Sequence, residues 1–401
     1  MLRNKNLLKL FSGTIISSFT QHMSFVITGS LAYQLTKSEF FSSIAWAGNA
    51  LAQIIAFPIS ILITDTKPKN LNLFFSYIIG ALTAILFAIL IYTNVVNIWL
   101  VIFYIVILSS AQFVGDTSGM SLVPFIAPKI QTQTTFSLIG LAYFFSSTLG
   151  PLATGQIVAS FGNASSILLK STLLICAALI YRSLKIENSD LKNNKKSIVD
   201  SIKSGYILIT KNQNVLNLFF IHWLIYMLAV PGIHGLLPVH ADEKFGLGVQ
   251  GVGYLFTVIG MGGVSSTMLL TILGDKIKNK TKLIALNTLS AGICMILFAQ
   301  NDSQIISLTF LFLFSFSIIN ILTLRLGLLG ELMPKNDLGK VFSINFLSSS
   351  TSIIGSSFIG IVSNSFGAVF GTTISGAIII ILLLFMIILL KSFRANVLGH
   401  Q

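Results

Sequence analysis

The sequence predicts an all-α membrane protein with twelve transmembrane helices arranged as two repeats of six. Three observations support this: the composition, the spacing of the apolar runs, and a repeat between the two halves of the chain. Of the 401 residues, 54% are hydrophobic and only 9% are charged, whereas soluble globular domains carry about 25% charged residues. A water-soluble fold of this composition would expose large apolar patches and aggregate. The same composition excludes a disordered chain, and two cysteines are too few for a disulfide scaffold.

Twelve apolar runs are long enough to cross a bilayer as helices, which takes about 20 residues each. They cover 10–33, 41–63, 71–92, 98–123, 134–160, 163–183, 215–239, 250–273, 283–300, 304–329, 340–363 and 367–390. Backbone polar groups in lipid must be bonded internally, and no run alternates as barrel strands do, so helices are expected throughout. The first run follows basic residues but is too long for a secretory signal, so it is expected to be a retained helix.

The basic residues predict the orientation. Placing the N-terminus in the cytoplasm and alternating the spans puts 21 of the 25 Lys and Arg residues in the inner breaks. Lys37 and Lys244 fall in outer breaks, while Lys170 and Arg325 lie inside spans. Because positively charged loops stay cytoplasmic, both termini are expected in the cytoplasm. The net charge of +13 therefore does not indicate nucleic-acid binding, since no basic stripe is interleaved with aromatic residues.

The two halves of the chain repeat each other. Four matched segments lie 205 to 210 residues apart: 4–11 with 212–219, the break at 65–69 with that at 275–278, Pro128-Lys129 with Pro334-Lys335, and Phe161-Gly162 with Phe366-Gly367. Parallel repeats of six spans are typical of secondary transporters. We expect an N-terminal half at 1–183, a basic cytoplasmic linker at 184–214, and a C-terminal half at 215–401. The linker is either a short amphipathic helix on the inner leaflet or a flexible connector.

Several short motifs resemble one family of transporters. They are NLLKLFSG at 6–13, YQLTKS at 33–38, LPV at 237–239, FGLG at 245–248, GVGYL at 251–255, MPK at 333–335 and GKV at 339–341. In this order they resemble the major facilitator superfamily over essentially the whole chain. Within it, the chain is similar to the drug:proton antiporter group that includes macrolide efflux proteins and the enterobactin exporter. The resemblance implies two six-helix halves around a central cavity, with alternating access.

The resemblance also implies gating residues. The superfamily's cytoplasmic loop motif corresponds here to Asp65 and Lys69 in the first half, and to Asp275, Lys276 and Lys278 in the second. Its Asp can cap a neighbouring helix while the cations hold the cytoplasmic ends together. The first copy is degraded, because the Gly of the motif is replaced by Ile61 and its Arg by Thr66.

The fifth span resembles the antiporter motif at Gly150, Pro151 and Gly155. Small residues let helices approach closely, and a proline loosens the helix backbone, as a rocking bundle would need. Ordinary small-residue packing is the alternative interpretation.

Two residues are candidates for proton coupling. Asp116 is the only acidic residue deep in a predicted span, and a charge there is a functional hypothesis by default. A buried carboxylate binds a proton more readily than one in water, so Asp116 could load and release protons; it could instead be the structural partner of a cation. His22 could supply a second titratable group, or be a hydrogen-bonded structural residue. Its neighbour Gln21 stands where the resembling group often carries an acid.

The predicted substrate-cavity residues are Gln21, Arg325, Lys170 and His234. Arg325 and Lys170 are the intramembrane cations, and both lie near enough to a helix end to snorkel instead. If Arg325 faces the cavity, the excess of cations favours an anionic or carboxylate-bearing substrate. His234 lies in the flexible segment 231–235, which suits gating, and the spacing of the histidines does not fit a zinc site.

These observations predict a transporter rather than an enzyme. The sequence has no phosphate-binding loop, so an ion gradient is the expected energy source and no cofactor or metal is expected. We expect proton-driven export of a small amphipathic molecule, a siderophore or a macrolide-like drug, by a monomer in the cytoplasmic (inner) membrane of a bacterium. Its expected partners are the substrate, protons and the lipid bilayer. A proton-coupled importer and a non-transporting membrane partner or sensor are the alternatives.

Overall fold

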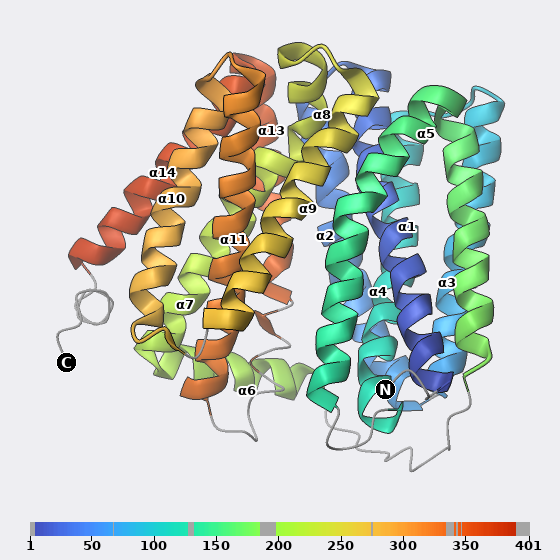
Figure 1. Cartoon of the computed structure of the whole chain (residues 1–401), viewed down its shortest axis with the longest axis horizontal. Coiled ribbons are helices and arrows are strands. Elements are labelled where there is room, and N and C mark those ends of the chain that lie inside the picture. Colours follow the sequence, from blue (N-terminus) through green and yellow to red (C-terminus); the bar gives the residue numbers. More distant parts are fainter. Residues whose placement is uncertain are drawn as a thin grey trace. The chain divides into compact units, whose positions relative to one another are not determined.

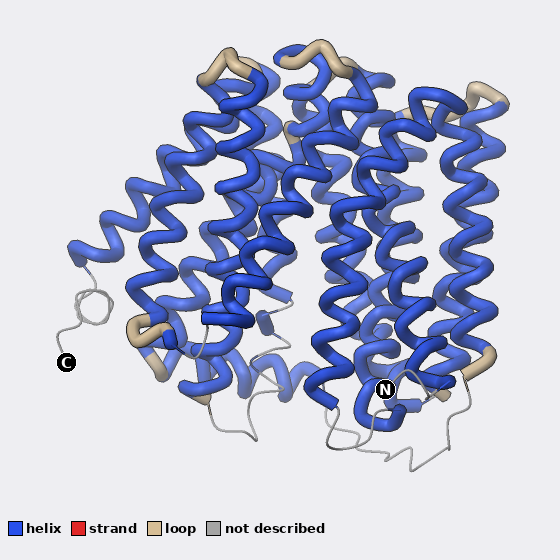
Figure 2. The backbone as a smooth tube through the Cα atoms, viewed as in Figure 1, coloured by secondary structure: helices blue, strands red, loops and turns tan. Residues whose placement is uncertain are grey.

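The computed structural model describes residues 5–66, 68–126, 132–184, 198–273, 276–333, 341, 344–345 and 347–389. Within this part of the chain the secondary structure is entirely helical, and no strand occurs (Figure 2). The all-α fold expected from the composition is thereby confirmed.

The helices correspond to the twelve predicted spans. Within the described part, nine helical stretches are long and apolar enough to cross a membrane. One of them contains two predicted spans, because α5 (Thr132–Arg182) reverses direction at Gly162. The other two predicted spans correspond to α1 (Lys5–Thr36) and α13 (Ser352–Phe366). The remaining long helices are α2 (Glu39–Thr66), α3 (Lys69–Tyr92), α4 (Ile98–Ile126), α7 (Gln213–Leu224) with its continuation to Lys244, α9 (Gly248–Leu273), α10 (Lys280–Gln300), α11 (Gln304–Leu332) and α14 (Ala368–Leu389).

The chain forms two compact units. Unit 1 comprises residues 1–37, 48–195 and 246–257, and unit 2 comprises 38–47, 196–245 and 258–401. A division at the linker would place 38–47 in the N-terminal half and 246–257 in the C-terminal half. The structure instead assigns 38–47 to unit 2 and 246–257 to unit 1. The predicted halves at 1–183 and 215–401 otherwise follow this pattern, and the exact division stays a prediction.

Unit 1 is built around α5. The helix contacts α1 and α3, and α3 also contacts α4; Figure 1 shows the two antiparallel arms of α5 joined by a turn. Gly162 forms that turn with φ 79° and ψ 172°, a conformation open essentially to glycine alone. Gly367 repeats it with φ 88° and ψ 157° between α13 and α14 in unit 2. The repeated Phe-Gly pair in the sequence therefore marks the same turn in each half.

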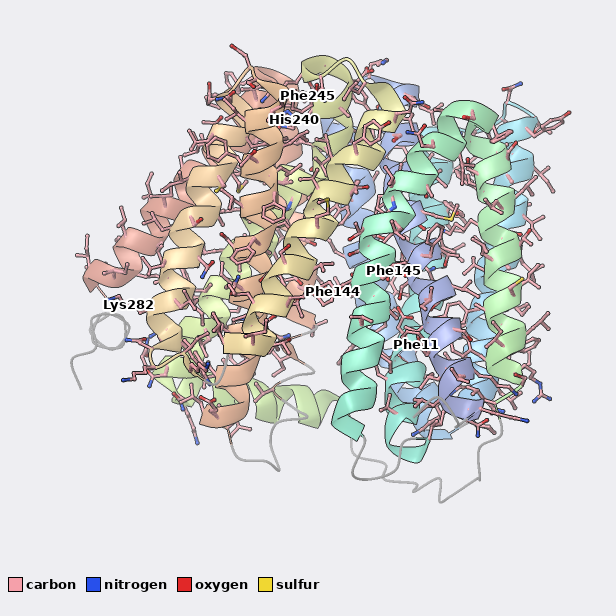
Figure 3. All side chains as sticks on the ribbon, in the orientation of Figure 1. Phe11, Phe144, Phe145, His240, Phe245 and Lys282 are labelled. Carbon is pink, nitrogen blue, oxygen red and sulfur yellow. The ribbon has the colours of Figure 1, made fainter. Side chains whose placement is uncertain are left out.

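Unit 2 contains an irregular helix. After α7 the chain continues through three π-helical segments, η2 (Ile225–Ala229), η3 (Pro231–Gly235) and η4 (His240–Lys244), with a short turn α8 (Leu237–Val239) between the last two. Three long helices, α10, α11 and α14, lie beside one another in this unit, since α10 contacts both of the others (Figure 1). In Figure 3, His240 and Phe245 lie together at one end of unit 2 and Lys282 lies at the other.

The linker contains a helix. Helix α6 (Ile198–Lys211) contacts the beginning of α7. Tyr206 and Ile207 are exposed on it, whereas Ile209 is buried. The segment 198–211 is therefore helical, and its placement as an amphipathic helix on the inner leaflet stays a prediction. The rest of the predicted linker up to residue 197 lies outside the described residues.

The π-helical segments pack closely against α13. A Cβ added at Gly355 would lie 1.9 Å from the backbone oxygen of Met227 in η2. By contrast, a Cβ at Gly327 in α11 would meet nothing within 4 Å. Glycine is therefore required at residue 355 for contact between two backbones, while residue 327 has no such constraint.

We expect Gly355→Ala to lower the free energy of unfolding by about 1–3 kcal/mol, because the added methyl group must push two helices apart. Gly327→Ala should leave it unchanged or raise it by up to about 1 kcal/mol, because alanine favours the helix. Thermal unfolding of the two purified variants in detergent measures both effects. Equal stability of the variants would contradict the close approach of α13 and η2.

Candidate functional site

Asp116 is held by a tyrosine in unit 1. The Tyr77 hydroxyl on α3 donates a hydrogen bond of 2.8 Å to Asp116 Oδ1 on α4. Tyr77 is buried, yet the Asp116 side chain is exposed. It lies about ten residues, or about 15 Å, before the end of α4. The carboxylate is therefore held by a buried donor, on a residue that is itself exposed.

Further hydroxyl groups continue this network. The ring of Tyr77 stacks on Tyr181 of α5 with centroids 5.2 Å apart. The Tyr181 hydroxyl lies 3.3 Å from Ser17 Oγ on α1. One turn further along α1, Thr20 accepts a long hydrogen bond of 3.5 Å from Gln112, which precedes Asp116 by one turn of α4. The Asp116 network thus joins four helices of unit 1.

Lys170 lies at the other end of the same row of hydroxyls. It is fully buried in the second arm of α5. Its ammonium group donates to Ser24 Oγ on α1 and, at 3.4 Å, to the Tyr104 hydroxyl on α4. Ser17, Thr20 and Ser24 lie on one face of α1, because residues three and four apart share a helix face. The alternative that Lys170 snorkels to the membrane surface is wrong, since none of the residue is exposed.

His22 packs between α1 and α5. Its Nδ1 lies 2.8 Å from the Ser18 carbonyl oxygen on its own helix, and its ring contacts Tyr143 edge-on at 5.0 Å. A Cβ at Gly150 would lie 3.1 Å from the His22 Cβ, so the small residue admits the histidine. This environment is the hydrogen-bonded structural one, and the described partners of His22 differ from those of Asp116. The neighbouring Gln21 is half-buried.

Arg325 is the buried cation of unit 2. It lies on α11, is 1% exposed, and donates through Nη2 to the side-chain oxygen of Asn345. Its guanidinium carbon lies 5.9 Å above the ring of Phe219 on α7. His222 and Tyr226 follow on the same helix, with their ring centroids 4.5 Å apart, and both interact electrostatically with Arg325. We call these five residues the Arg325 cluster. As with Lys170, burial contradicts snorkelling of Arg325.

His234 belongs to the π-helical part of unit 2. Its Nδ1 lies 3.3 Å from the Val230 carbonyl oxygen, and its ring lies 4.8 Å from that of Trp46. Hydroxyl groups from other helices bond backbone oxygens in this part: Ser42 donates to the Gly235 oxygen at 2.7 Å, and Thr372 to the Gly232 oxygen at 2.9 Å. His234 therefore lies in an irregular helical segment whose backbone oxygens accept hydrogen bonds from side chains of neighbouring helices.

Three of the five predicted gating residues have described side chains. Lys69 Nζ donates to the Ser121 carbonyl oxygen at 3.3 Å, and Lys276 and Lys278 are exposed. Asp275 and the side chain of Asp65 lie outside the part of the chain that the structure describes.

The small residues of the fifth span are in close contacts. A Cβ at Gly155 would lie 3.1 Å from the Cα of Gly253 in α9, within unit 1. The backbone oxygen of Pro151 lies only 2.7 Å from a Cβ built on the same Gly253. Ordinary close packing accounts for both contacts, and the role of Gly150, Pro151 and Gly155 in antiport stays a prediction.

Sequence reasoning missed the neutral partners of the charges. Tyr77, Tyr104 and Asn345 each come from a helix distant in sequence from the charge that they contact. Sequence reasoning also gave no role to His222. Its position three residues after Phe219 and four before Tyr226 could have indicated a shared aromatic and polar face.

Comparison with known proteins identifies the family to which this architecture belongs. The sequence profile of the Major Facilitator Superfamily matches residues 10–355. The helical membrane fold and this match define a transporter rather than an enzyme. The chain belongs to the Major Facilitator Superfamily and is a multi-pass membrane protein of the secondary transporter type. No curated protein matches it significantly.

Solved structures share the fold at low identity. A mutant of the nucleoside transporter NupG matches with a TM-score of 0.80 and 12% identity, covering 98% of this chain and 99% of that one. A mutant of the peptide transporter POT matches with a TM-score of 0.78 and 11% identity, covering 98% of this chain and 96% of that one. A bacterial homologue of the human lysosomal transporter Spinster matches with a TM-score of 0.72 and 10% identity, covering 98% of this chain and 96% of that one. At these identities the likeness concerns the fold alone.

Burial of Lys170 without an acidic partner among the described residues makes it costly, because an ammonium group loses its hydration. We expect Lys170→Met to raise the melting temperature of the purified protein, since methionine fills similar space without burying a charge. The control Lys5→Met removes an exposed charge and should leave the melting temperature unchanged. A lower melting temperature for Lys170→Met would mean that its bonds to Ser24 and Tyr104 outweigh the desolvation.

Proposed function

We propose that the protein is a proton-driven antiporter that exports a small amphipathic molecule across the cytoplasmic membrane of a bacterium. The observation that carries the proposal is Asp116, an exposed acidic residue far inside a span whose carboxylate accepts a hydrogen bond from the Tyr77 hydroxyl. The siderophore or macrolide-like character of the molecule comes from the sequence resemblance. Alternating access would exchange the molecule for protons entering the cell.

Protonation of Asp116 would change the bonding of four helices. The ionised carboxylate only accepts hydrogen bonds, whereas the protonated acid also donates one. Tyr77 donates to it now, and the stacked Tyr181 reaches Ser17 on α1. A proton arriving at Asp116 would therefore alter the contacts of α1, α3, α4 and α5 together, which is what coupling to a conformational change requires.

Lys170 adds to this argument because it gives unit 1 a balancing charge. With Asp116 ionised, the spans of unit 1 carry one exposed negative charge and one buried positive charge, on helices joined by the Ser17, Thr20 and Ser24 hydroxyls. Lys170 forms no ion pair with Asp116, so the carboxylate attracts it only at longer range. Protonating Asp116 removes this attraction and raises the free energy of the buried positive charge. Loading of a proton would thus favour a conformation in which Lys170 is hydrated or neutral.

The orientation of the proposed exporter follows from its lysines. Lys276, Lys278 and Lys282 lie around the beginning of α10 and are exposed. Lys282 lies at the end of unit 2 away from His240 and Phe245 (Figure 3). By the positive-inside rule this end of unit 2 faces the cytoplasm, and the distribution of basic residues along the sequence predicts cytoplasmic termini.

The test uses everted membrane vesicles, in which export pumps substrate inward and releases protons to the outside. Addition of a siderophore panel or a macrolide panel should release protons from wild-type vesicles. Asp116→Asn should abolish the release, because the amide cannot carry the proton. Tyr77→Phe keeps the carboxylate but removes its donor, so we expect release with a shifted pH profile.

Glu331→Gln is the matched control, since it neutralises an exposed carboxylate paired with Lys280 and should release protons like the wild type. Release that survives in Asp116→Asn would move the coupling site elsewhere, with His22 the next candidate. Proton uptake instead of release would indicate an importer. If neither panel causes proton release or uptake, the substrate belongs to another chemical class or the protein is a non-transporting membrane partner.

A further inference from the structure

We propose that the Arg325 cluster of unit 2 binds a carboxylate group of the transported molecule. The inference rests on the proposed function and names the chemical class of its substrate: an organic acid whose apolar or aromatic body accompanies the charged group. The cluster consists of Phe219, His222, Tyr226, Arg325 and Asn345.

The guanidinium group of Arg325 has unused donors. Its Nη2 bonds Asn345, but Nε and Nη1 have no hydrogen-bond partner although the residue is 1% exposed. A buried polar group left without a partner costs about 1–3 kcal/mol, and more when it is charged. A planar guanidinium with free donors is the group that proteins use most often to bind carboxylates. The geometry is therefore that of a site prepared for an anion.

Charge balance points to the same conclusion. The ion pair between Lys280 and Glu331 is exposed and does not involve Arg325. Asn345, which contacts Arg325, is neutral. The charge of Arg325 is thus compensated by no described carboxylate, and an anion from outside the chain would compensate it.

The neighbouring rings select an organic rather than an inorganic anion. His222 is 2% exposed, and neither of its ring nitrogens has a hydrogen-bond partner. The Phe219 ring lies under the guanidinium, and Tyr226 is half-buried beside His222. These groups offer two more hydrogen-bonding atoms and two aromatic faces for the body of an amphipathic acid.

The experiment measures equilibrium binding to the purified full-length protein in lipid nanodiscs, without a proton gradient. The probes are benzoate, 4-phenylbutyrate, 2,3-dihydroxybenzoate and citrate, together with the primary amides of the first three and inorganic phosphate. We expect at least one carboxylate to bind at least about tenfold more tightly than its amide and than phosphate. Arg325→Gln should remove this preference, and Arg325→Lys should keep part of it.

Asn345→Asp is the sharpest variant. It changes the size of the side chain very little and places a carboxylate where the Arg325 Nη2 already donates, so the chain's own acid should displace the probe. Binding should weaken by at least about tenfold while the protein stays folded. Asn301→Asp adds the same charge between α10 and α11, away from the cluster, and should bind like the wild type.

Three results would overturn the inference: no carboxylate bound more tightly than its amide, a preference unchanged in both Arg325→Gln and Asn345→Asp, or phosphate bound as tightly as the carboxylates. The outcome is separate from that of the vesicle experiment. Carboxylate binding lost in Asn345→Asp, without proton release from vesicles, would keep this site and reject proton-driven export. Proton release without carboxylate binding would keep export and reject the site.

Discussion

The structure depends on one constraint: a polar group in the apolar interior of a membrane protein must find its partner within the protein. Hydroxyl side chains meet this need throughout. In α1, Thr20 and Thr28 bond carbonyl oxygens of their own helix, at 2.7 Å in both cases. In the π-helical part of unit 2, where the regular hydrogen-bond ladder is interrupted, Ser42 and Thr372 bond backbone oxygens from neighbouring helices. Irregular backbone is tolerated there because other helices supply donors.

The same constraint makes the intramembrane charges informative. Lys170 finds its hydrogen-bond partners in Ser24 and Tyr104, and Asp116 finds one in Tyr77. Arg325 satisfies it incompletely, since two of its nitrogens have no partner. A charge that is costly to bury and only partly bonded persists where function requires it. In our account the acid of unit 1 carries the proton and the arginine of unit 2 carries the substrate's anionic group.

The sequence predicted the fold well and the site only partly. Twelve apolar runs and the repeated Phe-Gly pairs located the helices and the turns at Gly162 and Gly367, because hydrophobic length and glycine backbone freedom are local properties. Asp116, Lys170 and Arg325 stood out because charges are rare in spans. Their partners could not be predicted, since Tyr77, Ser24 and Asn345 reach them only through tertiary packing. The burial of Lys170 was likewise unpredictable, because its nearness to a helix end was equally compatible with snorkelling.

The central claim is that the protein moves an amphipathic organic acid out of the cell, using Asp116 and Arg325. The most direct measurement compares the small molecules in the medium of cells that lack the protein with those in the medium of cells that produce it, by untargeted mass spectrometry. We predict a carboxylate-bearing compound in the medium that depends on the wild-type protein and is missing with Asp116→Asn and with Arg325→Gln. A compound exported equally by both variants, or one without an acidic group, would contradict the account.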